Sequence, residues 1–427
     1  MLNKRSLEVL ERAMWNIPFK RPLYKEYAFS QIPQIVRHLF DPSLPSGCAK
    51  DALAKNHAPY DIVLTLLIDG FGWNLLEKYG PQISSLRRFE EEGVLSKFSS
   101  QFPTTTAAHI TTLHSGLEVG QTGIYEWFYY EPLLDQMIAP LLFSFARDHE
   151  PETLLKTSMA PEKIFPFPTL YEQLHRQGVS SYVLQPQNIA HSPYSQVMCA
   201  GAELHGYKDL KEGFQYVVDS CKEMQSSPRY IYIYFGEVDA IGHRQGIGSD
   251  AILHSVQACW AKVERELYLP LKNISKRIAL LITADHGMSP VDPKTTIYLN
   301  KRFPKLQSTL KKNQQGGTLV PAGSCRDFFL HVQPKHLSDV YSMLKEEMQS
   351  IAQVHMTQDL LNMHFFGEKG HSPRLLERIG DIVVLPLYSE SVWWYEHGVF
   401  EQHFYGAHGG LTKEEIEIPF FFCDIHK

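Results

Sequence analysis

The hydrophobic and polar positions of this chain alternate on the scale of whole elements, with strand-like runs separated by short polar turns. The strand-like runs lie at residues 61–68, 94–100, 180–184, 229–235, 277–284 and 418–423. A continuous apolar run is typical of a strand covered on both faces, because neither side of it meets water. Stretches with a helical pattern lie between and after these runs, at residues 73–78, 106–115, 169–177, 250–271 and 337–350. The alternation predicts an α/β fold, with a doubly wound, mostly parallel central sheet and helices on both faces.

Three segments depart from this rhythm and set the expected domain organisation. Residues 1–58 combine an amphipathic beginning with a proline-studded middle, and we expect a packing extension there. Residues 59–427 then form the main domain. Inside it, the segments at about 127–178 and 290–400 mix Pro-rich turns with shorter strand-like and helical pieces, which predicts inserted cap segments.

Composition limits the classes of partner. The chain has 427 residues, 44% hydrophobic and 21% charged, with a formal net charge of −6, so nothing in its charge favours binding to a nucleic-acid duplex. Every apolar run is interrupted before it could span a bilayer, so no membrane span is expected. The first residues alternate charged and aliphatic side chains and lack the apolar core of a signal peptide, so we expect a cytoplasmic protein. The six cysteines contain no Cys-x-x-Cys pair and predict neither a zinc knuckle nor a disulfide framework.

The first candidate for chemistry is Asp69, which ends the apolar run 61–68 and is followed by Gly70. Open α/β sheets bind their ligands at the carboxyl ends of the strands. A buried carboxylate is unfavourable there unless it is paired with, or bound to, a cation. The alternative is that Asp69 caps the helix at residues 73–78.

Other metal-type residues lie beyond later strands or in glycine turns. Asp239 and His243 follow the run 229–235 and are four residues apart, so one helical turn places both on the same face, although a solvated turn explains them as well. Asp285 and His286 are adjacent at the end of the run 277–284, with Gly287 behind them. His408 lies among glycines before the last strand and could also be an ordinary loop residue.

A hydroxyl-rich segment, Phe102-Pro103-Thr104-Thr105-Thr106, leads into the helix at 106–115. The N-terminus of a helix presents backbone N–H groups and favours negative charge, so a hydroxyl there is well placed to attack phosphorus. The alternative is that these threonines only cap the helix.

The segment after this helix, from Gly123 to Tyr130, carries five aromatic residues and one acid. Aromatic side chains mostly fill cores, but a run of five cannot all point inward, so some should line a cleft. Three arginines, Arg326, Arg374 and Arg378, could contact an anion, although salt bridges explain them more simply.

Together the strand-end residues form a constellation, since strand ends converge along one rim of an α/β sheet. They supply seven ligands, which suits two zinc-like ions with open coordination positions: Asp69, Thr106, Asp239, His243, Asp285, His286 and His408.

The order of these motifs resembles the alkaline phosphatase superfamily and, within it, the nucleotide pyrophosphatase/phosphodiesterase (type I phosphodiesterase) family. The matching pieces are Ile68-Asp69-Gly70, Phe102-Pro103-Thr104-Thr105-Thr106, Gly123-Ile124, Asp239-Ala240-Ile241-Gly242-His243, Ala284-Asp285-His286-Gly287-Met288 and Ala407-His408-Gly409.

The resemblance implies two divalent metal ions, with zinc expected and manganese as the alternative. It implies that Asp239, His243 and His408 bind one ion, and that Asp69, Asp285 and His286 bind the second together with the nucleophile. The nucleophile it implies is Thr106, with Thr105 as the second choice. Thr106 would attack phosphorus to give a phospho-threonyl intermediate, which water then hydrolyses. The expected substrate is a small phosphodiester or a nucleotide, with phosphodiester or pyrophosphate bonds cleaved.

The chain departs from the family near the substrate. Family members that hydrolyse nucleotides carry an Asn after the Gly-Ile turn, whereas this chain has Glu126 or Trp127 there, with Tyr125 before them. We expect these three residues to contact substrate, although an ionised Glu would repel phosphate. The family's Asn-His after the nucleophile is replaced by Ala107-Ala108-His109.

These departures leave other functions open. A phosphomonoesterase or a phosphonate hydrolase could use the same metal site. A sulfatase is disfavoured because the chain has no Cys-x-Pro-x-Arg motif. A non-catalytic binding protein is disfavoured because all seven ligand positions are filled. The sequence does not indicate an oligomeric state.

Overall fold

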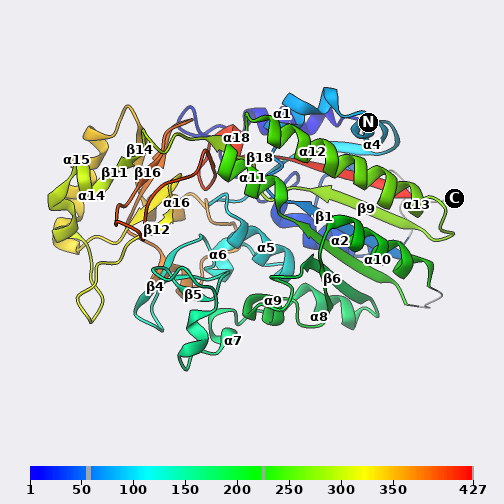
Figure 1. Ribbon diagram of the computed structural model, residues 1–427, viewed down its shortest axis with the longest axis horizontal. Coiled ribbons are helices and arrows are strands. Elements are labelled where there is room, and N and C mark those ends of the chain that lie inside the picture. Colours follow the sequence, from blue (N-terminus) through cyan, green and yellow to red (C-terminus); the bar gives the residue numbers. More distant parts are fainter. Residues whose placement is uncertain (54–58, 224–226, 426–427) are drawn as a thin grey trace.

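The computed structural model of the protein describes residues 1–53, 59–223 and 227–425. A central sheet runs through the larger part of the molecule, and residues from about 290 to 400, yellow to orange in Figure 1, lie at the opposite end from the two chain termini. No helix of the described ranges is long and apolar enough to cross a membrane.

The central sheet has seven strands in the order β2-β18-β9-β1-β8-β6-β7. Their bounds are β1 (Ile62–Ile68), β2 (Val94–Ser99), β6 (Ser180–Pro186), β7 (Glu203–Tyr207), β8 (Arg229–Phe235), β9 (Ile278–Thr283) and β18 (Glu417–Ile425). Every residue of β1, β2 and β9 is buried, and because successive side chains point to opposite faces, both faces of the sheet are covered. The predicted doubly wound, mostly parallel α/β sheet is confirmed.

Strand direction determines where the site can form. β1 pairs in parallel with β8 and β9, and β6 pairs in parallel with β7 and β8. β18 is antiparallel to both β2 and β9, so six strands share one direction and β18 alone runs the other way. The carboxyl ends of six strands and the segment that enters β18 therefore meet at one edge of the sheet.

The helices form two groups whose members contact one another. One group contains α3 (Trp73–Tyr79), α4 (Ser84–Glu92), α10 (Leu210–Lys222), α11 (Glu237–Gln245), α12 (Asp250–Lys262) and α13 (Leu269–Leu271). The other contains α2 (Ile32–Phe40), α5 (Thr106–Ser115), α6 (Val119–Thr122), α7 (Pro161–Ile164), α8 (Leu170–Arg176) and α9 (Pro193–Met198). Near the N-terminus, α1 (Lys4–Arg12) packs beside β2.

The helix predicted over residues 250–271 is one run of helical residues that changes from α-helix to π-helix and back. After α12, residues Val263–Tyr268 form a π-helical segment, and α13 follows. Pro270 has no N–H to donate to a carbonyl one turn earlier, so the ordinary α-helical ladder cannot continue through it.

The segments outside the central sheet form small sheets of their own. A three-stranded antiparallel sheet contains β3 (Tyr129–Glu131), β4 (Gln136–Ala139) and β5 (Ser144–Phe145). A four-stranded antiparallel sheet contains β12 (Ala322–Ser324), β13 (Asp327–Leu330), β14 (Ala352–Met356) and β15 (Ile382–Pro386). Two short pairs are β10 (Ser289–Pro290) with β17 (Gly406–Ala407) and β11 (Ile297–Tyr298) with β16 (Val392–Trp393). The remaining helices are α14 (Leu299–Arg302), α15 (Leu337–Glu347), α16 (Thr357–Asn362), α17 (Pro373–Arg378) and α18 (Lys413–Ile416).

Candidate active site

The seven predicted metal-binding and nucleophilic residues all lie at the edge of the central sheet where the six parallel strands end. Their positions are Asp69 after β1, Thr106 at the start of α5 after β2, Asp239 and His243 in α11 after β8, Asp285 and His286 after β9, and His408 before β18. Residues far apart in the sequence meet here because the strands that carry them share one sheet.

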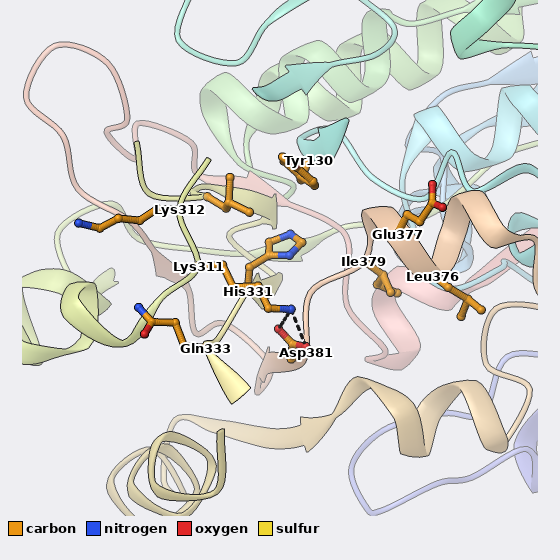
Figure 2. A pocket seen from close by; sticks show the side chains of 10 residues that line it. Tyr130, Lys311, Lys312, His331, Gln333, Leu376, Glu377, Ile379 and Asp381 are labelled. Carbon is orange, nitrogen blue, oxygen red and sulfur yellow. Dashed lines mark hydrogen bonds and ion pairs between the residues drawn. The ribbon is translucent and has the colours of Figure 1, made fainter. Parts of the chain in front are cut away.

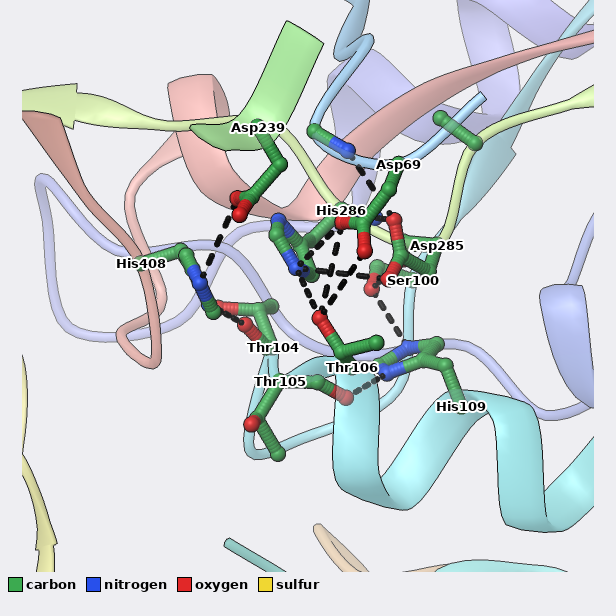
Figure 3. Close-up of polar contacts among 12 residues, drawn as sticks. Asp69, Ser100, Thr104, Thr105, Thr106, His109, Asp239, Asp285, His286 and His408 are labelled. Carbon is green, nitrogen blue, oxygen red and sulfur yellow. Dashed lines mark hydrogen bonds and ion pairs between the residues drawn. The ribbon is translucent and has the colours of Figure 1, made fainter. Parts of the chain in front are cut away.

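The first group of ligand atoms surrounds the Thr106 hydroxyl. Thr106 Oγ1 lies 3.1 Å from His286 Nε2 and 3.4 Å from Asp69 Oδ2. His286 Nε2 in turn lies 3.4 Å from Asp69 Oδ1 and 3.3 Å from Asp285 Oδ2. Figure 3 shows these side chains converging from three strand ends on one point. One ligand atom from each of Asp69, Asp285 and His286 lies within 4.8 Å of the others, and this oxygen and nitrogen set fits a divalent ion.

The second group contains Asp239, His243 and His408, whose ligand atoms also lie within 4.8 Å of one another. Asp239 Oδ1 lies 3.4 Å from His243 Nε2 and 3.6 Å from His408 Nε2, and it has no hydrogen-bond partner among the described residues. Asp239 and His243 share one face of α11, as their spacing predicts. The groups adjoin, because the rings of His286 and His408 stack with their centroids 3.6 Å apart.

Backbone carbonyls fix the orientation of all three imidazoles. His286 Nδ1 donates to Gly287 O at 3.1 Å. His243 Nδ1 donates to Gly406 O at 2.8 Å, and His408 Nδ1 donates to Thr104 O at 2.8 Å. A carbonyl oxygen can only accept, so each Nδ1 carries the proton and each Nε2 keeps its lone pair for an ion. A ring held in this way is typical of a metal-ligating histidine.

The electrostatics of the site favour a bound cation. Burial raises the pKa of Asp69 well above its usual value, and the charges of Asp285 and Asp239 raise it further. Burial also raises the pKa of Asp239 to about 6. Burial lowers the pKa of His286 and of His408 well below the usual value. Carboxylates that repel one another, beside imidazoles that stay neutral, form a site whose charge a divalent ion would balance.

The threonine segment makes no side-chain helix cap. Thr105 is the N-cap of α5, but its hydroxyl makes no hydrogen bond to the helix, whereas Thr106 is the first helical residue. The N–H groups of the first turn of a helix lack intrahelical partners and can therefore bind phosphoryl oxygens. Thr106 Oγ1 faces the ligand groups, and Figure 3 shows the Thr105 hydroxyl turned away from it. Asp69 does not cap a helix either, since Gly72 is the N-cap of α3.

Three further residues support the site and were not identified from the sequence. The Tyr234 hydroxyl, at the end of β8, donates to Asp69 Oδ2. The Ser100 hydroxyl donates to Asp285 O at 2.6 Å. His109 Nδ1 donates to Thr105 O at 2.7 Å, and its Nε2 accepts from the Gln101 N–H at 2.8 Å. Burial lowers the pKa of His109 to about 4, so the ring is neutral and joins the start of α5 to the end of β2. Tyr234 is one of three tyrosines that alternate with isoleucines along β8, and this pattern gives no local signal of its role.

The aromatic segment divides between core and surface. Tyr125 is fully buried, stacks on Tyr129 and directs its hydroxyl to Arg378 O. Glu126 is also fully buried, and Trp127 alone of the three residues expected to contact substrate is partly exposed. Burial thus separates these three neighbours, which the sequence does not distinguish.

Two of the three candidate arginines form buried ion pairs. Arg326 makes two hydrogen bonds to Glu415, at 2.9 and 3.0 Å, and Arg378 pairs with Glu131 at 2.6 Å. Glu415 also accepts from Gly410 N, two residues after His408, and its backbone carbonyl accepts from Gly287 N. The Arg326–Glu415 pair therefore holds the loops that carry His408 and His286.

A separate cavity of about 490 Å³ lies in the part of the molecule that contains the four-stranded sheet (Figure 2). Tyr130, Lys312 and His331 line it together with the ion pair between Lys311 and Asp381, whose closest approach is 2.9 Å. None of its lining residues belongs to the two ligand groups.

The two ligand groups fit a metal-dependent hydrolase of phosphoester bonds, and this is the class that the family match defines. A sequence model described as type I phosphodiesterase / nucleotide pyrophosphatase matches residues 63–411. This match covers most of the chain, so the protein belongs to that family, and the resemblance inferred from the motifs is confirmed. A search of curated protein sequences found no match.

Solved structures share the fold at low sequence identity. Human ectonucleotide pyrophosphatase/phosphodiesterase 5 is similar with a TM-score of 0.63 and 17% identity, over 84% of this chain and 87% of that one. An inactive form of the murine protein in complex with AMP gives a TM-score of 0.61 at the same identity and coverage. Phosphonoacetate hydrolase from Sinorhizobium meliloti, in complex with phosphonoformate, gives a TM-score of 0.59 and 16% identity, over 87% and 92% of the two chains.

Proposed function

We propose that this protein cleaves phosphodiester or pyrophosphate bonds in a small substrate such as a nucleotide, with Thr106 as the nucleophile on a two-zinc site. The observation that carries the proposal is the position of Thr106 Oγ1, which lies 3.1 Å from His286 Nε2 and beside the Asp69 carboxylate, with the Asp239 group adjoining. Asp69, Asp285 and His286 would hold one ion, and Asp239, His243 and His408 the other. Zinc fits this set of carboxylates and imidazoles, and manganese is the alternative.

When bound, the two ions would lower the pKa of a hydroxyl and stabilise the negative charge that develops on phosphoryl oxygens. The chain's own groups supply the rest. Thr106 Oγ1 forms a bond to phosphorus as the bond from phosphorus to the leaving oxygen breaks, which gives a phospho-threonyl intermediate. Water then attacks phosphorus and releases Thr106. The unpaired N–H groups at the start of α5 would donate to phosphoryl oxygens in both steps.

Substrate contacts on the protein side begin with Trp127, which is partly exposed and can donate through its indole N–H. The chain has no amide at this position, so the phosphoryl group would depend more on the ligand groups and on α5. Tyr125 and Glu126 are both fully buried, so we propose Trp127 alone of the three as a substrate contact.

The test compares Thr106→Ala and Thr106→Ser with the wild type, using bis(p-nitrophenyl) phosphate as the diester and p-nitrophenyl phosphate as the monoester. We expect Thr106→Ala to lose on the order of 10³-fold or more in kcat while its zinc content stays near two, and Thr106→Ser to retain part of the rate. Unchanged turnover by Thr106→Ala would refute the nucleophile. A wild-type preference for the monoester, or for a phosphonate such as phosphonoacetate, would replace the diester as the substrate class.

A further inference from the structure

The cavity beside the four-stranded sheet contains a buried histidine whose ring is not fully used by the protein. His331 directly follows β13, lines the cavity and is only 3% exposed. Its Nε2 atom is buried and has no hydrogen-bond partner among the described residues. Buried polar atoms in folded proteins nearly always have a partner, and a cavity of about 490 Å³ is large enough for a small molecule that would supply one.

The charged groups beside His331 balance one another. Lys311 Nζ lies 3.0 Å from Asp381 Oδ1 and 2.9 Å from Asp381 Oδ2. Burial lowers the pKa of His331 to about 4, so the imidazole is neutral. Figure 2 shows the ring of His331 between Tyr130 and the Lys311–Asp381 pair. This part of the cavity therefore offers hydrogen-bond donors and acceptors without a net charge.

Two further charged residues line the cavity, Lys312 and Glu377, and both are exposed. In Figure 2 the ammonium group of Lys312 and the carboxylate of Glu377 point away from His331, in different directions. Their charges are opposite, so they add no net charge either. A cavity without excess charge does not select a strongly charged ligand such as a phosphate, because binding sites are complementary in charge to what they bind.

The remaining walls are aromatic and apolar. The rings of Tyr130 and His331 meet edge to face with their centroids 5.8 Å apart. Leu319 and Ile379 are buried, whereas Leu376 lines the cavity and is 53% exposed. A flat ligand would cover the exposed apolar surface of Leu376, which stabilises the complex in proportion to the area removed from water.

Backbone contacts hold the polar groups in place. The Lys311 N–H donates to His331 O at 2.7 Å, and the Val332 N–H donates to Asp381 Oδ2 at 2.8 Å. These bonds join the segments that carry Lys311, His331 and Asp381. A site whose groups are already positioned loses little conformational freedom when a ligand enters.

We propose that this cavity binds a small planar molecule, neutral overall, that carries a hydrogen-bond donor and an acceptor side by side, such as a nitrogen heterocycle or an aromatic amide. The Lys311–Asp381 pair presents both a donor and an acceptor, and the neutral imidazole of His331 presents one of each. The flat body of the ligand would lie against Tyr130. The competing occupant is water alone, which would satisfy His331 but would leave Leu376 uncovered.

The test follows binding to the full-length, zinc-loaded protein by NMR, with nicotinamide as the amide and adenine as the heterocycle. Nicotinate and 3-picolylamine carry the same pyridine ring as nicotinamide with a negative or a positive charge. Histidine-selective ¹⁵N labelling identifies the ring signals of His331 as those missing in His331→Gln. We expect nicotinamide or adenine to shift these signals, and the two charged probes to bind there at least about tenfold more weakly. Only the His331 signals are counted, so a probe held at the metal-binding groups does not affect the result.

Variants separate a binding role of His331 from a structural one. His331→Leu removes the polar edge of the ring and should weaken the binding of nicotinamide at least about tenfold, measured by ligand-detected saturation transfer. His331→Gln keeps a donor and an acceptor and should stay within about threefold of the wild type. His336 does not line the cavity, so His336→Leu is the matched control and should bind as the wild type does. If His331→Leu fails to fold, Leu376→Asp changes only an exposed wall and should weaken binding at least about threefold.

The proposal shares no residue with the two ligand groups, so its outcome is independent of the proposed function. Equal binding of nicotinamide by the wild type and His331→Leu, or tighter binding of nicotinate than of nicotinamide at His331, would overturn it. If neither nicotinamide nor adenine shifts the His331 signals at millimolar concentrations, water is the only occupant and the proposal is wrong.

Discussion

Two groups of buried carboxylates lie next to the Thr105–Thr106 segment, and they differ in what surrounds them. Asp69, Asp239 and Asp285 lie among imidazoles at the edge of the sheet, next to a half-buried hydroxyl. Glu126 and Asp327 are enclosed, without histidine and without a basic partner among the described residues. A third case, Glu415, is as deeply buried but is paired with Arg326. The comparison teaches that a buried acid needs a partner. Glu415 has a guanidinium, Asp69, Asp239 and Asp285 form a group whose charge a divalent ion would balance, and Glu126 and Asp327 interact with each other.

The largest expected effect comes from removing one charge at the sheet edge. Asp69→Asn keeps an oxygen that can accept from Tyr234 but removes a ligand charge, so we expect kcat to fall on the order of 10³-fold or more and one metal ion to be lost. The metal-free variant should be more stable than the metal-free wild type, because Asp285 and Asp239 repel the Asp69 charge. Metal content and thermal unfolding in a chelator measure both effects. A metal-free variant less stable than the wild type would contradict the repulsion.

The next prediction concerns the paired acid. Arg326→Met leaves the Glu415 carboxylate buried without its counterion and should reduce the free energy of unfolding by about 3–5 kcal/mol. The double variant Arg326→Met/Glu415→Leu should recover most of that loss in chemical denaturation, because neither charge remains. Failure of the double variant to recover would assign the loss to packing around the guanidinium.

The pH dependence of the metal-free protein sharpens the comparison further. Burial raises the pKa of Glu126 to about 8. A carboxyl whose folded pKa exceeds its unfolded value binds a proton more tightly in the folded state, so stability falls as pH rises toward the folded pKa. Buried histidines such as His109, whose folded pKa lies near 4, change the stability in the opposite direction, because the unfolded chain binds protons that they do not. The contribution of Glu126 is therefore the difference between the wild type and Glu126→Gln in a chelator. We expect the free energy of unfolding of the wild type, relative to that of Glu126→Gln, to fall by about 1 kcal/mol for each pH unit between pH 6.5 and 8.

Glu126→Gln is the reference for this measurement, since it removes the titrating carboxyl and keeps the histidines. A difference between the two profiles that stays constant or rises over this range would contradict the sign of the shift.

The smallest expected effect is at Tyr234. Tyr234→Phe removes one hydrogen bond to Asp69 and should lower kcat by roughly 3- to 10-fold, with a loss of about 1 kcal/mol or less in stability. That bond favours the ionised form of Asp69, so its loss should raise the pKa of the carboxyl and move the acid limb of the pH–rate profile to higher pH. Tyr232→Phe, in the same strand but without a hydrogen-bond partner for its hydroxyl among the described residues, is the matched control and should leave the profile unchanged.

Much of the fold could be predicted from the sequence, because its strands are locally unmistakable. The runs at 61–68, 229–235 and 277–284 correspond to β1, β8 and β9, and the helix at 106–115 corresponds to α5. β7 and α10 were not identified, since their short or mixed patterns gain order only from packing on β6 and β8. The order of the strands and the reversed direction of β18 also depend on pairing between distant segments, which local pattern does not encode.

The sequence by itself determined which residues could carry the chemistry. Asp69, Asp285 and His286 each follow an apolar run directly, and a polar group at the end of a buried strand needs a partner whatever the rest of the chain does. This rule selected the candidate ligands. A threonine at the N-terminus of a helix supplied the candidate nucleophile.

Only the tertiary structure decided how those residues lie. It brings the ligand atoms of each group within 4.8 Å of one another, turns Thr106 toward them and Thr105 away, and buries Glu126 beside Asp327, which begins β13. The physical reason is that burial and charge pairing depend on which segments pack together, and segments that pack together in this fold are separated by hundreds of residues in the chain.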